Sequence, residues 1–200
     1  MSSIVLENVS KKYYKETIIK EINLELKPGK YHLKGINGSG KTTLLSVIAG
    51  IEKPSFGRVV NSENIDFCSD KIDIPPKLTV FDSFKLYDKY NRSNTKFRDE
   101  LVRLFNFENF IHHKYEDLSE GSKKKLKIIL TFSGTGSWIL LDEPTNALDK
   151  NSIENVKILI EESVRPLILV DHSGCCVNSL FSIIEIKEGE LCIVKYQDHY

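Results

Sequence analysis

Residues 35–43, Gly-Ile-Asn-Gly-Ser-Gly-Lys-Thr-Thr, are the stretch of this chain best suited to hold a phosphate group. They fit the spacing G-x-x-x-x-G-K-[ST], in which a glycine-rich backbone turns several N–H groups toward phosphate oxygens. The lysine of the pattern can reach the β- and γ-phosphates of a nucleotide, and the following hydroxyl can ligate Mg²⁺. The pattern predicts the phosphate-binding residues Gly35, Asn37, Gly38, Ser39, Gly40, Lys41, Thr42 and Thr43.

A second stretch that could take part in catalysis ends at Asp142 and Glu143, which directly follow the apolar run Trp-Ile-Leu-Leu of residues 138–141. Such a run is typical of a strand buried on both faces of a parallel sheet, whose carboxyl edge is where ligands bind. There Asp142 would hold Mg²⁺ and Glu143 would deprotonate the attacking water. Alone, such a pair is more often a solvated turn or a helix cap, but together with the glycine-rich loop it favours the functional interpretation.

The elements expected around these residues are those of an α/β fold. Residues 31–34 are strand-like before the glycine-rich loop, and residues 43–49 are helix-like after it. Residues 22–26 alternate in polarity, and residues 183–194 suggest a hairpin with Gly189 in its turn. Short strands are also expected at residues 58–60, 65–68 and 166–171, and helices near residues 79–82, 97–105 and 151–164.

Composition excludes several classes of protein. Lys plus Arg equals Asp plus Glu at 28 each, so bulk charge does not favour nucleic acid as a direct partner. The four cysteines show no C-x-x-C spacing, and we expect them to be reduced and buried. His112 and His113 have no partner at metal-ligand spacing, so they predict no transition-metal site. Neither a signal peptide nor an apolar run long enough to cross a bilayer is expected.

Taken together, the motifs resemble those of the ATP-binding cassette (ABC) ATPases, in the order in which that family carries them. The adenine-stacking aromatic corresponds to Tyr13, with Tyr14 as a rival, and the switch histidine corresponds to His172. Residues 118–122, Leu-Ser-Glu-Gly-Ser, are similar to the family's signature, and residues 140–149 match the second acidic motif with the loop after it. The resemblance implies that Ser119 and Gly121 meet the γ-phosphate of ATP bound to an opposite subunit.

Two positions depart from the family pattern. Asp70 stands where similar proteins have a glutamine that touches Mg²⁺ and the attacking water, so we expect Asp70 to be a third metal ligand beside Thr42 and Asp142. The alternative is that the alignment is shifted there and Asp70 is a surface acid. Glu120 adds negative charge to the signature and should weaken closure, unless it points away or meets the lysines of residues 123–125.

The resemblance implies a P-loop NTPase core with a mainly parallel sheet, an N-terminal antiparallel β lobe and an inserted α-helical lobe. The core would comprise residues 1–75 and 133–200, and the helical lobe residues 76–132. Phe81, Phe84 and Tyr87 are candidates for contact with a partner of that lobe. The predicted cofactors are ATP and Mg²⁺, with Lys41, Glu143 and His172 as the catalytic residues.

The predicted activity is ATP hydrolysis by a subunit that pairs with itself or with a second nucleotide-binding subunit. The resemblance implies that it powers a transporter through a separately encoded transmembrane permease subunit, at the cytoplasmic face of the membrane. Two alternatives stay open: an ATPase of a soluble assembly, and a nucleotide-dependent regulator that hydrolyses ATP weakly.

Overall fold

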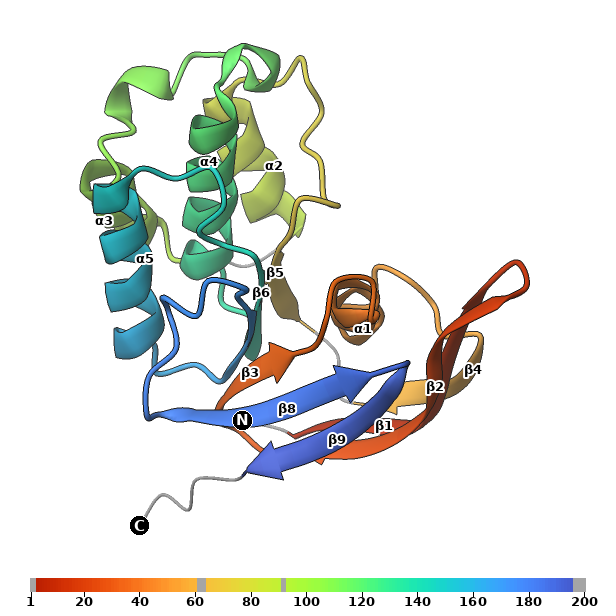
Figure 1. Ribbon diagram of the computed structural model, residues 1–200. Helices are drawn as coiled ribbons and strands as arrows, with labels where there is room; N and C mark the ends of the chain where they lie inside the picture. The colour runs from red at the N-terminus through yellow and green to blue at the C-terminus, as the bar shows by residue number, and fades with distance from the viewer. Residues whose placement is uncertain (1–2, 61–63, 91–92, 196–200) are drawn as a thin grey trace.

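Two β-sheets and a group of helices make up the computed structural model, which describes residues 3–60, 64–90 and 93–195, with side chains through residue 191 (Figure 1). The strands are β1 Ile4–Tyr13, β2 Glu16–Leu26, β3 Lys30–Lys34, β4 Phe56–Val60, β5 Ile65–Cys68, β6 Trp138–Asp142, β7 Leu167–Val170, β8 Phe181–Lys187 and β9 Glu190–Lys195. The α-helices are α1 Lys41–Ile48, α2 Val80–Tyr90, α3 Thr95–Leu104, α4 Glu120–Ser133 and α5 Lys150–Glu162, and two short 3₁₀ turns span Glu108–Phe110 and Tyr115–Asp117.

The larger sheet has the strand order β5-β6-β7-β3-β8-β9. All its neighbouring strands run parallel except β8 and β9, which form the predicted hairpin with Gly189 in the turn. The smaller sheet, β2-β1-β4, is antiparallel throughout. The expected fold class is therefore confirmed: a mainly parallel sheet, an antiparallel β lobe at the N-terminus and helices inserted between β5 and β6.

The central strands are buried on both faces, as their unbroken apolar sequences predict. On β6, Trp138 and Leu140 face a core built with α1 and the small sheet, whereas Ile139 and Leu141 face a core built with the helices α2–α5. Successive side chains of a strand point to opposite faces, so one short strand supports both cores. Figure 1 shows α2, α3, α4 and α5 gathered at one end of the molecule and the strands β1, β2, β4, β8 and β9 at the other.

Helix boundaries agree with the sequence except at α5. This helix begins after Asp149, whose carboxylate accepts a hydrogen bond from Ser152 N at 2.9 Å, and it ends at Glu162. The helix expected near residues 151–164 therefore ends two residues early, and Val164 lies beyond it and is exposed. The helix expected near residues 97–105 is α3, in which Leu101 is buried and Leu104 is exposed; Phe105, just after it, is buried too.

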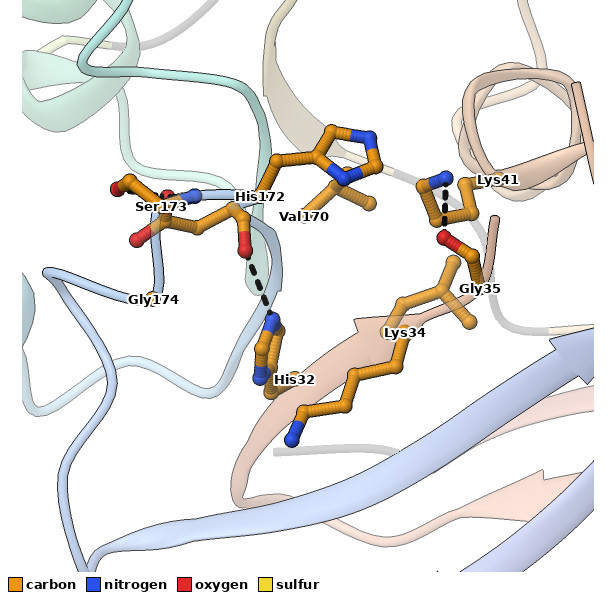
Figure 2. Close-up of a pocket in the computed structure, with 10 residues that line it drawn as sticks. His32, Lys34, Gly35, Lys41, Val170, His172, Ser173 and Gly174 are labelled. Carbon is orange, nitrogen blue, oxygen red and sulfur yellow. Dashed lines mark hydrogen bonds between the residues drawn. The ribbon is translucent and has the colours of Figure 1, made fainter. Parts of the chain in front are cut away.

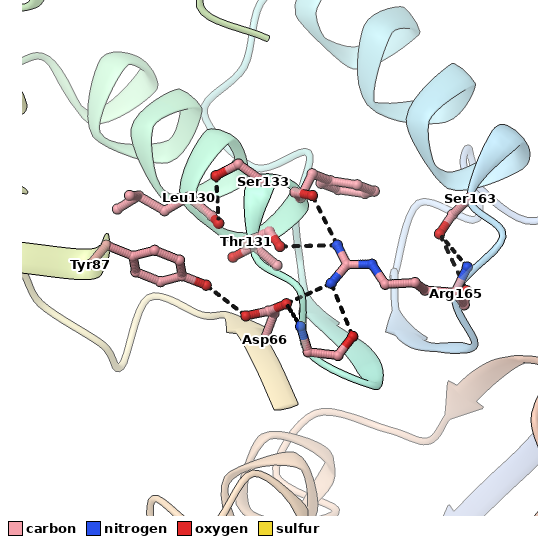
Figure 3. Close-up of polar contacts among 9 residues, drawn as sticks. Asp66, Tyr87, Leu130, Thr131, Ser133, Ser163 and Arg165 are labelled. Carbon is pink, nitrogen blue, oxygen red and sulfur yellow. Dashed lines mark hydrogen bonds and ion pairs between the residues drawn. The ribbon is translucent and has the colours of Figure 1, made fainter. Parts of the chain in front are cut away.

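A buried ionic cluster connects the helices to the amino ends of the parallel strands (Figure 3). Arg165, just before β7, donates to Asp66 Oδ2 at 2.5 Å and to the carbonyl of Phe132 at the end of α4 at 2.9 Å. Asp66 also accepts from Tyr87 Oη at 2.6 Å and from Gly136 N at 2.8 Å. We call Asp66, Tyr87, Gly136 and Arg165 the lobe junction, because α2, α4, β5 and the segments before β6 and β7 meet there.

The lobe junction corrects the expectation for two candidate partner-contact residues. Tyr87 is half-buried and its hydroxyl is bonded to Asp66, so it is part of the junction. Phe84 is buried in the helical core, whereas Phe81 is exposed, with the ammonium of Lys85 4.3 Å from its ring centroid. Of the three aromatic residues, only Phe81 presents the exposed surface that a partner could cover.

Candidate functional site

The glycine-rich loop joins β3 to α1, as the sequence predicts. Gly35 has φ +156°, and a Cβ there would lie 2.6 Å from the Ile186 carbonyl of the neighbouring strand. Gly40 has φ +98° at the position preceding α1. Glycine is the residue that adopts such φ values without strain, so both positions require it. The first N–H groups of α1 remain without helical partners and face the loop, which suits an anion.

Lys41 is the first residue of α1 and its ammonium lies inside the loop. Nζ donates to the carbonyls of Gly35 at 2.8 Å and of Ile36 at 2.9 Å. Burial lowers the pKa of Lys41 from its ordinary value, and Glu143 and Asp142 act in the opposite direction. The lysine is thus a largely buried cation beside two carboxylates, in the position where a phosphate chain would meet the loop.

Three oxygen-bearing side chains meet at the carboxyl end of β6. Thr42 Oγ1 donates to Asp142 Oδ1 at 3.2 Å, and Ser69 Oγ donates to Asp142 Oδ2 at 3.1 Å. Two hydroxyls and a carboxylate are hard oxygen donors of the kind that Mg²⁺ prefers, usually with waters and substrate phosphates completing its shell. The residues present therefore fit the predicted Mg²⁺.

Asp70 does not lie beside the three side chains that meet at the carboxyl end of β6. Its Oδ1 accepts an ion pair from Lys124 Nζ at 2.6 Å, and 64% of its side chain is exposed. The residue that contacts Asp142 is its neighbour Ser69, which is fully buried. Both residues follow the end of β5, where the chain enters a turn, and the turn directs Ser69 inward and Asp70 outward. The assignment of Asp70 as a metal ligand stays a prediction.

Glu143 and His172 face each other across the ends of β6 and β7. Glu143 Oε1 is buried 3.4 Å from His172 Nε2, and it accepts no hydrogen bond from any residue the structure describes. Glu143 Oε2 accepts from His172 N at 3.4 Å. Burial is the main reason why the pKa of Glu143 is raised above its ordinary value. A carboxylate with a raised pKa and a free oxygen is suited to accept a proton from water.

Two adjacent cavities of about 300 Å³ each open around Lys41 and His172. The first is lined by residues of β1, β2, the glycine-rich loop, α1 and the carboxyl ends of β6 and β7: Tyr13, Ile18, Asn37, Gly38, Gly40, Lys41, Thr42, Thr43, Asp142, Glu143, Val170 and His172. The second, shown in Figure 2, extends from Lys41 toward His32 and the turn after β7. Most of the site residues predicted from the sequence are therefore brought together around one cavity.

Tyr13, and not Tyr14, reaches this cavity. Tyr13 ends β1, its hydroxyl donates to Glu52, and the Lys11 ammonium lies 5.0 Å from its ring centroid. Tyr14 follows with φ +51° and is fully exposed at the hairpin turn. The aromatic ring that could stack on a base at the cavity rim is that of Tyr13, as the sequence analysis favoured.

The signature residues lie at the start of α4, outside the lining of both cavities described above. Ser119 Oγ accepts a hydrogen bond from Ser122 N at 3.2 Å and so caps α4. Gly121 packs against the loop after Glu143, because a Cβ there would lie 2.8 Å from the carbonyl oxygen of Ala147. Glu120 forms an ion pair with Lys123 at 2.8 Å, which offsets its charge.

Sequence reasoning missed three buried polar residues of the site. Ser69 contacts Asp142, and Lys124 donates to the Glu143 carbonyl at 3.1 Å although a run of lysines is usually a solvated face. His32 Nε2 lies 3.2 Å from the Asp171 carbonyl oxygen, and its Nδ1 is buried without a partner among the described residues. Burial also lowers the pKa of His32. The sequence offered one indication that His32 lies near the site: it belongs to the expected strand of residues 31–34, which leads directly into the glycine-rich loop.

The cysteine prediction is partly wrong. Cys68 and Cys176 are free and buried, but Cys175 is free and exposed, because the turn after β7 carries it outward. Cys192 lies on β9, and its side chain falls outside those described. Among the described residues, no helix is both long and apolar enough to cross a membrane.

Comparison with known proteins gives consistent matches. The family model "ABC transporter" matches residues 19–146. The chain is 30% identical to a macrolide export ATP-binding/permease protein of Vibrio parahaemolyticus over 88% of its own length, and it spans about a third of the length of that relative. It is 28% identical to the lipoprotein-releasing system ATP-binding protein of Francisella tularensis, over 97% of this chain and 98% of that protein.

Solved structures agree with the sequence matches. A dimeric bacterial ABC transporter cassette superposes with a TM-score of 0.79 at 27% identity, covering 94% of this chain and 96% of that one. A dimeric post-hydrolysis state of that cassette, bound to ADP and phosphate, gives a TM-score of 0.79 at 26% identity. An ATP-binding subunit of an ABC transporter has a TM-score of 0.83 at 18% identity, which bears on the fold alone.

Proposed function

Because this chain belongs to the ABC transporter family, we propose that it is the ATP-binding subunit of such a transporter and hydrolyses ATP to ADP and phosphate. The observation that carries the proposal is the pairing of Glu143 with His172 beside Lys41, at a cavity of about 300 Å³. A cation, a general base and an orienting histidine thus line one space next to a phosphate-binding loop.

In this proposal each residue has one task. The loop amides and the Lys41 ammonium bind the phosphate chain, and Tyr13 stacks on adenine. Thr42 and Asp142 would hold Mg²⁺, with Ser69 orienting Asp142; the metal would supply positive charge beside the transferred phosphoryl group. Glu143 accepts the proton of the water that attacks the γ-phosphorus, as the bond to the β-phosphate oxygen breaks. His172 positions Glu143 and that water.

We further propose that two such subunits act as a pair. Ser119 and Gly121 do not line either of the two cavities around Lys41, so each would complete the site of the opposite subunit. The dimeric form of the similar cassette supports this arrangement. Residues 1–75 with 133–200 would form the nucleotide-binding core, and residues 76–132 would form the lobe that contacts a permease through exposed residues such as Phe81.

The permease is proposed to be a separate transmembrane subunit, with this chain at the cytoplasmic face of the membrane. The lipoprotein-releasing relative is an ATP-binding protein that this chain matches over nearly its whole length, which supports a separate permease. The macrolide relatives are ATP-binding/permease proteins, of which this chain matches about a third. No observation favours a soluble assembly or a weakly hydrolysing regulator.

The test is steady-state release of phosphate from Mg²⁺-ATP by the purified chain, with Glu143→Gln as the variant. We expect the variant to lose roughly 10²–10⁴-fold in rate, the contribution of a general base, while still forming an ATP-dependent dimer. Glu154→Gln is the matched control, because Glu154 is an exposed acid on α5 that pairs with Lys157, and its rate should equal that of wild type. Equal rates for Glu143→Gln and wild type would overturn the assignment of Glu143.

A further inference from the structure

The turn that follows β7 brings together three groups that could ligate a metal. The carboxylate of Asp171 and the thiols of Cys175 and Cys176 each offer one ligand atom, and these atoms all lie within 4.8 Å of one another. The two sulfur atoms are 3.7 Å apart. None of these side chains has a task in the proposed hydrolysis, so the cluster needs its own explanation.

Hydrogen bonds within the turn hold the three groups in place. The buried Asp171 carboxylate accepts from Ser173 N and from Cys176 N, each at 2.9 Å. The N–H of Cys175 donates to Ser173 Oγ at 3.2 Å, and Gly174 turns the chain with φ +67°. The backbone is therefore already folded around the carboxylate, and a ligand would not have to order it.

The spacing of the sulfur atoms fits one kind of ion. Tetrahedral zinc binds thiolates at about 2.3 Å, which places two of its sulfur ligands roughly 3.8 Å apart. The distance from Cys175 Sγ to Cys176 Sγ is nearly the same, at 3.7 Å. Two sulfurs and one oxygen favour a thiophilic cation over Mg²⁺, which takes oxygen ligands. Since Cys175 is exposed, an ion can enter from solvent and keep water as its fourth ligand.

The charge around the turn is also suitable. Two thiolates and one carboxylate with a divalent cation leave one negative charge. Lys157 on α5 interacts electrostatically with both cysteine sulfurs and also pairs with Glu154 at 3.2 Å, so its ammonium offsets part of that charge. A buried charged group needs such a partner.

We propose that Asp171, Cys175 and Cys176 form a binding site for one thiophilic divalent cation, with Zn²⁺ as the probe of that class. The site goes beyond the proposed ATPase function and shares no residue with the expected Mg²⁺ ligands. His172 is the neighbour of Asp171 in the chain and faces Glu143. A bound ion therefore fixes the segment that carries the switch histidine.

The experiment measures metal binding by the full-length, reduced, nucleotide-free chain. Zn²⁺ is titrated in competition with a chromophoric chelator, and Cd²⁺ is titrated while the ultraviolet sulfur-to-metal charge-transfer band is recorded. We expect one equivalent of either ion per chain and a thiolate band with Cd²⁺. Because neither readout requires ATP hydrolysis, the result is independent of the ATPase proposal.

Variants assign the ligands. Cys175→Ser changes an exposed side chain, so the fold should persist, and we expect the affinity to fall about tenfold or more. The matched control, Cys68→Ala with Cys192→Ala, leaves Cys175 and Cys176 as the only thiols of the chain and should bind like wild type. Asp142→Asn should also leave binding unchanged. The proposal fails if wild type shows no thiolate band, or if Cys175→Ser binds as tightly as wild type.

Discussion

Buried charged residues lie at both ends of the strands β5, β6 and β7. Asp66 at the amino ends and Glu143 at the carboxyl ends differ in how completely they are paired. At the amino ends, each oxygen of Asp66 has a partner, and Arg165 gives it a full opposite charge. At the carboxyl ends, Glu143 has a buried oxygen that accepts no hydrogen bond from the described residues, and its pKa is raised. Complete pairing serves stability, whereas an incompletely paired acid is available for chemistry.

The largest expected effect is the loss of Arg165 from the lobe junction. Arg165→Met leaves the Asp66 carboxylate buried without its cation, so the free energy of unfolding should fall by about 3–5 kcal/mol. Urea denaturation followed by circular dichroism measures this. The matched control is Arg58→Met, because Arg58 pairs with Glu7 at 2.6 Å on the surface, and its stability should stay close to wild type. Equal stability of the two variants would contradict the comparison.

A smaller loss is expected for Tyr87→Phe, which removes only the hydroxyl bonded to Asp66 at 2.6 Å. Hydrogen bonds to charged groups contribute about 1.5–3 kcal/mol, and the unfolding free energy should fall by that amount. The same denaturation assay applies, with Tyr90→Phe as the control because Tyr90 is exposed at the end of α2. If Tyr87→Phe were as stable as wild type, Tyr87 would return to the candidates for partner contact.

Asp149, the exposed acid that precedes α5, is also paired. The hydrogen bond from Ser152 N, assisted by Lys125, keeps the pKa of Asp149 far below its ordinary value of 3.8. Asp149→Ala removes the cap of α5 and should lower the unfolding free energy by about 1 kcal/mol at neutral pH. A depressed pKa stabilises the fold above pH 3.8, and this is lost as the pH falls through the folded value. The difference between variant and wild type should therefore shrink in strong acid.

The smallest effect, of opposite sign, is expected for Glu143→Gln. Because the pKa of Glu143 is raised, its stabilising contribution is present below the ordinary value of 4.5 and is lost as the pH rises through the folded pKa. At neutral pH the ionised carboxylate of Glu143 therefore lowers the free energy of unfolding. The variant should reach its unfolding midpoint at a slightly higher urea concentration than wild type. Denaturation at neutral pH and near pH 4.5 should show this advantage disappear in acid. If Glu143→Gln were less stable than wild type at neutral pH, Glu143 would stabilise the fold as Asp66 does, and the proposed difference between the two ends of the strands would be wrong.

Sequence patterns predicted the residues of the carboxyl edge because these lie in short, continuous motifs. The contact of Thr42 with Asp142 follows from two motifs that end parallel strands at one edge. The contact of Ser69 with Asp142 was not predictable, because the pattern does not define which of two consecutive residues points inward after a strand. The burial of Lys124 was missed for a related reason, since a run of three lysines carries no periodic signal.

The lobe junction was invisible in the sequence. Asp66 and Arg165 are separated by 99 positions, and neither belongs to a local pattern. Tyr87 looked like one more aromatic residue on a helix, and only tertiary packing reveals its hydroxyl as a partner of Asp66. Long-range pairs of buried charges depend on the complete fold, so a single sequence does not indicate them.

The position of Arg165 has a consequence for how the chain folds during synthesis. Asp66, α2 and α4 all leave the ribosome before residue 165 does. The carbonyls of Thr131 and Phe132 therefore have no hydrogen bond from the Arg165 guanidinium until that residue has been synthesised. Until then Asp66 lacks its cation, so the helical segment is completed only after β6 and α5 have been made. Residues 76–132 expressed alone would lack both Asp66 and Arg165, and we expect such a fragment to be a poor independent folding unit.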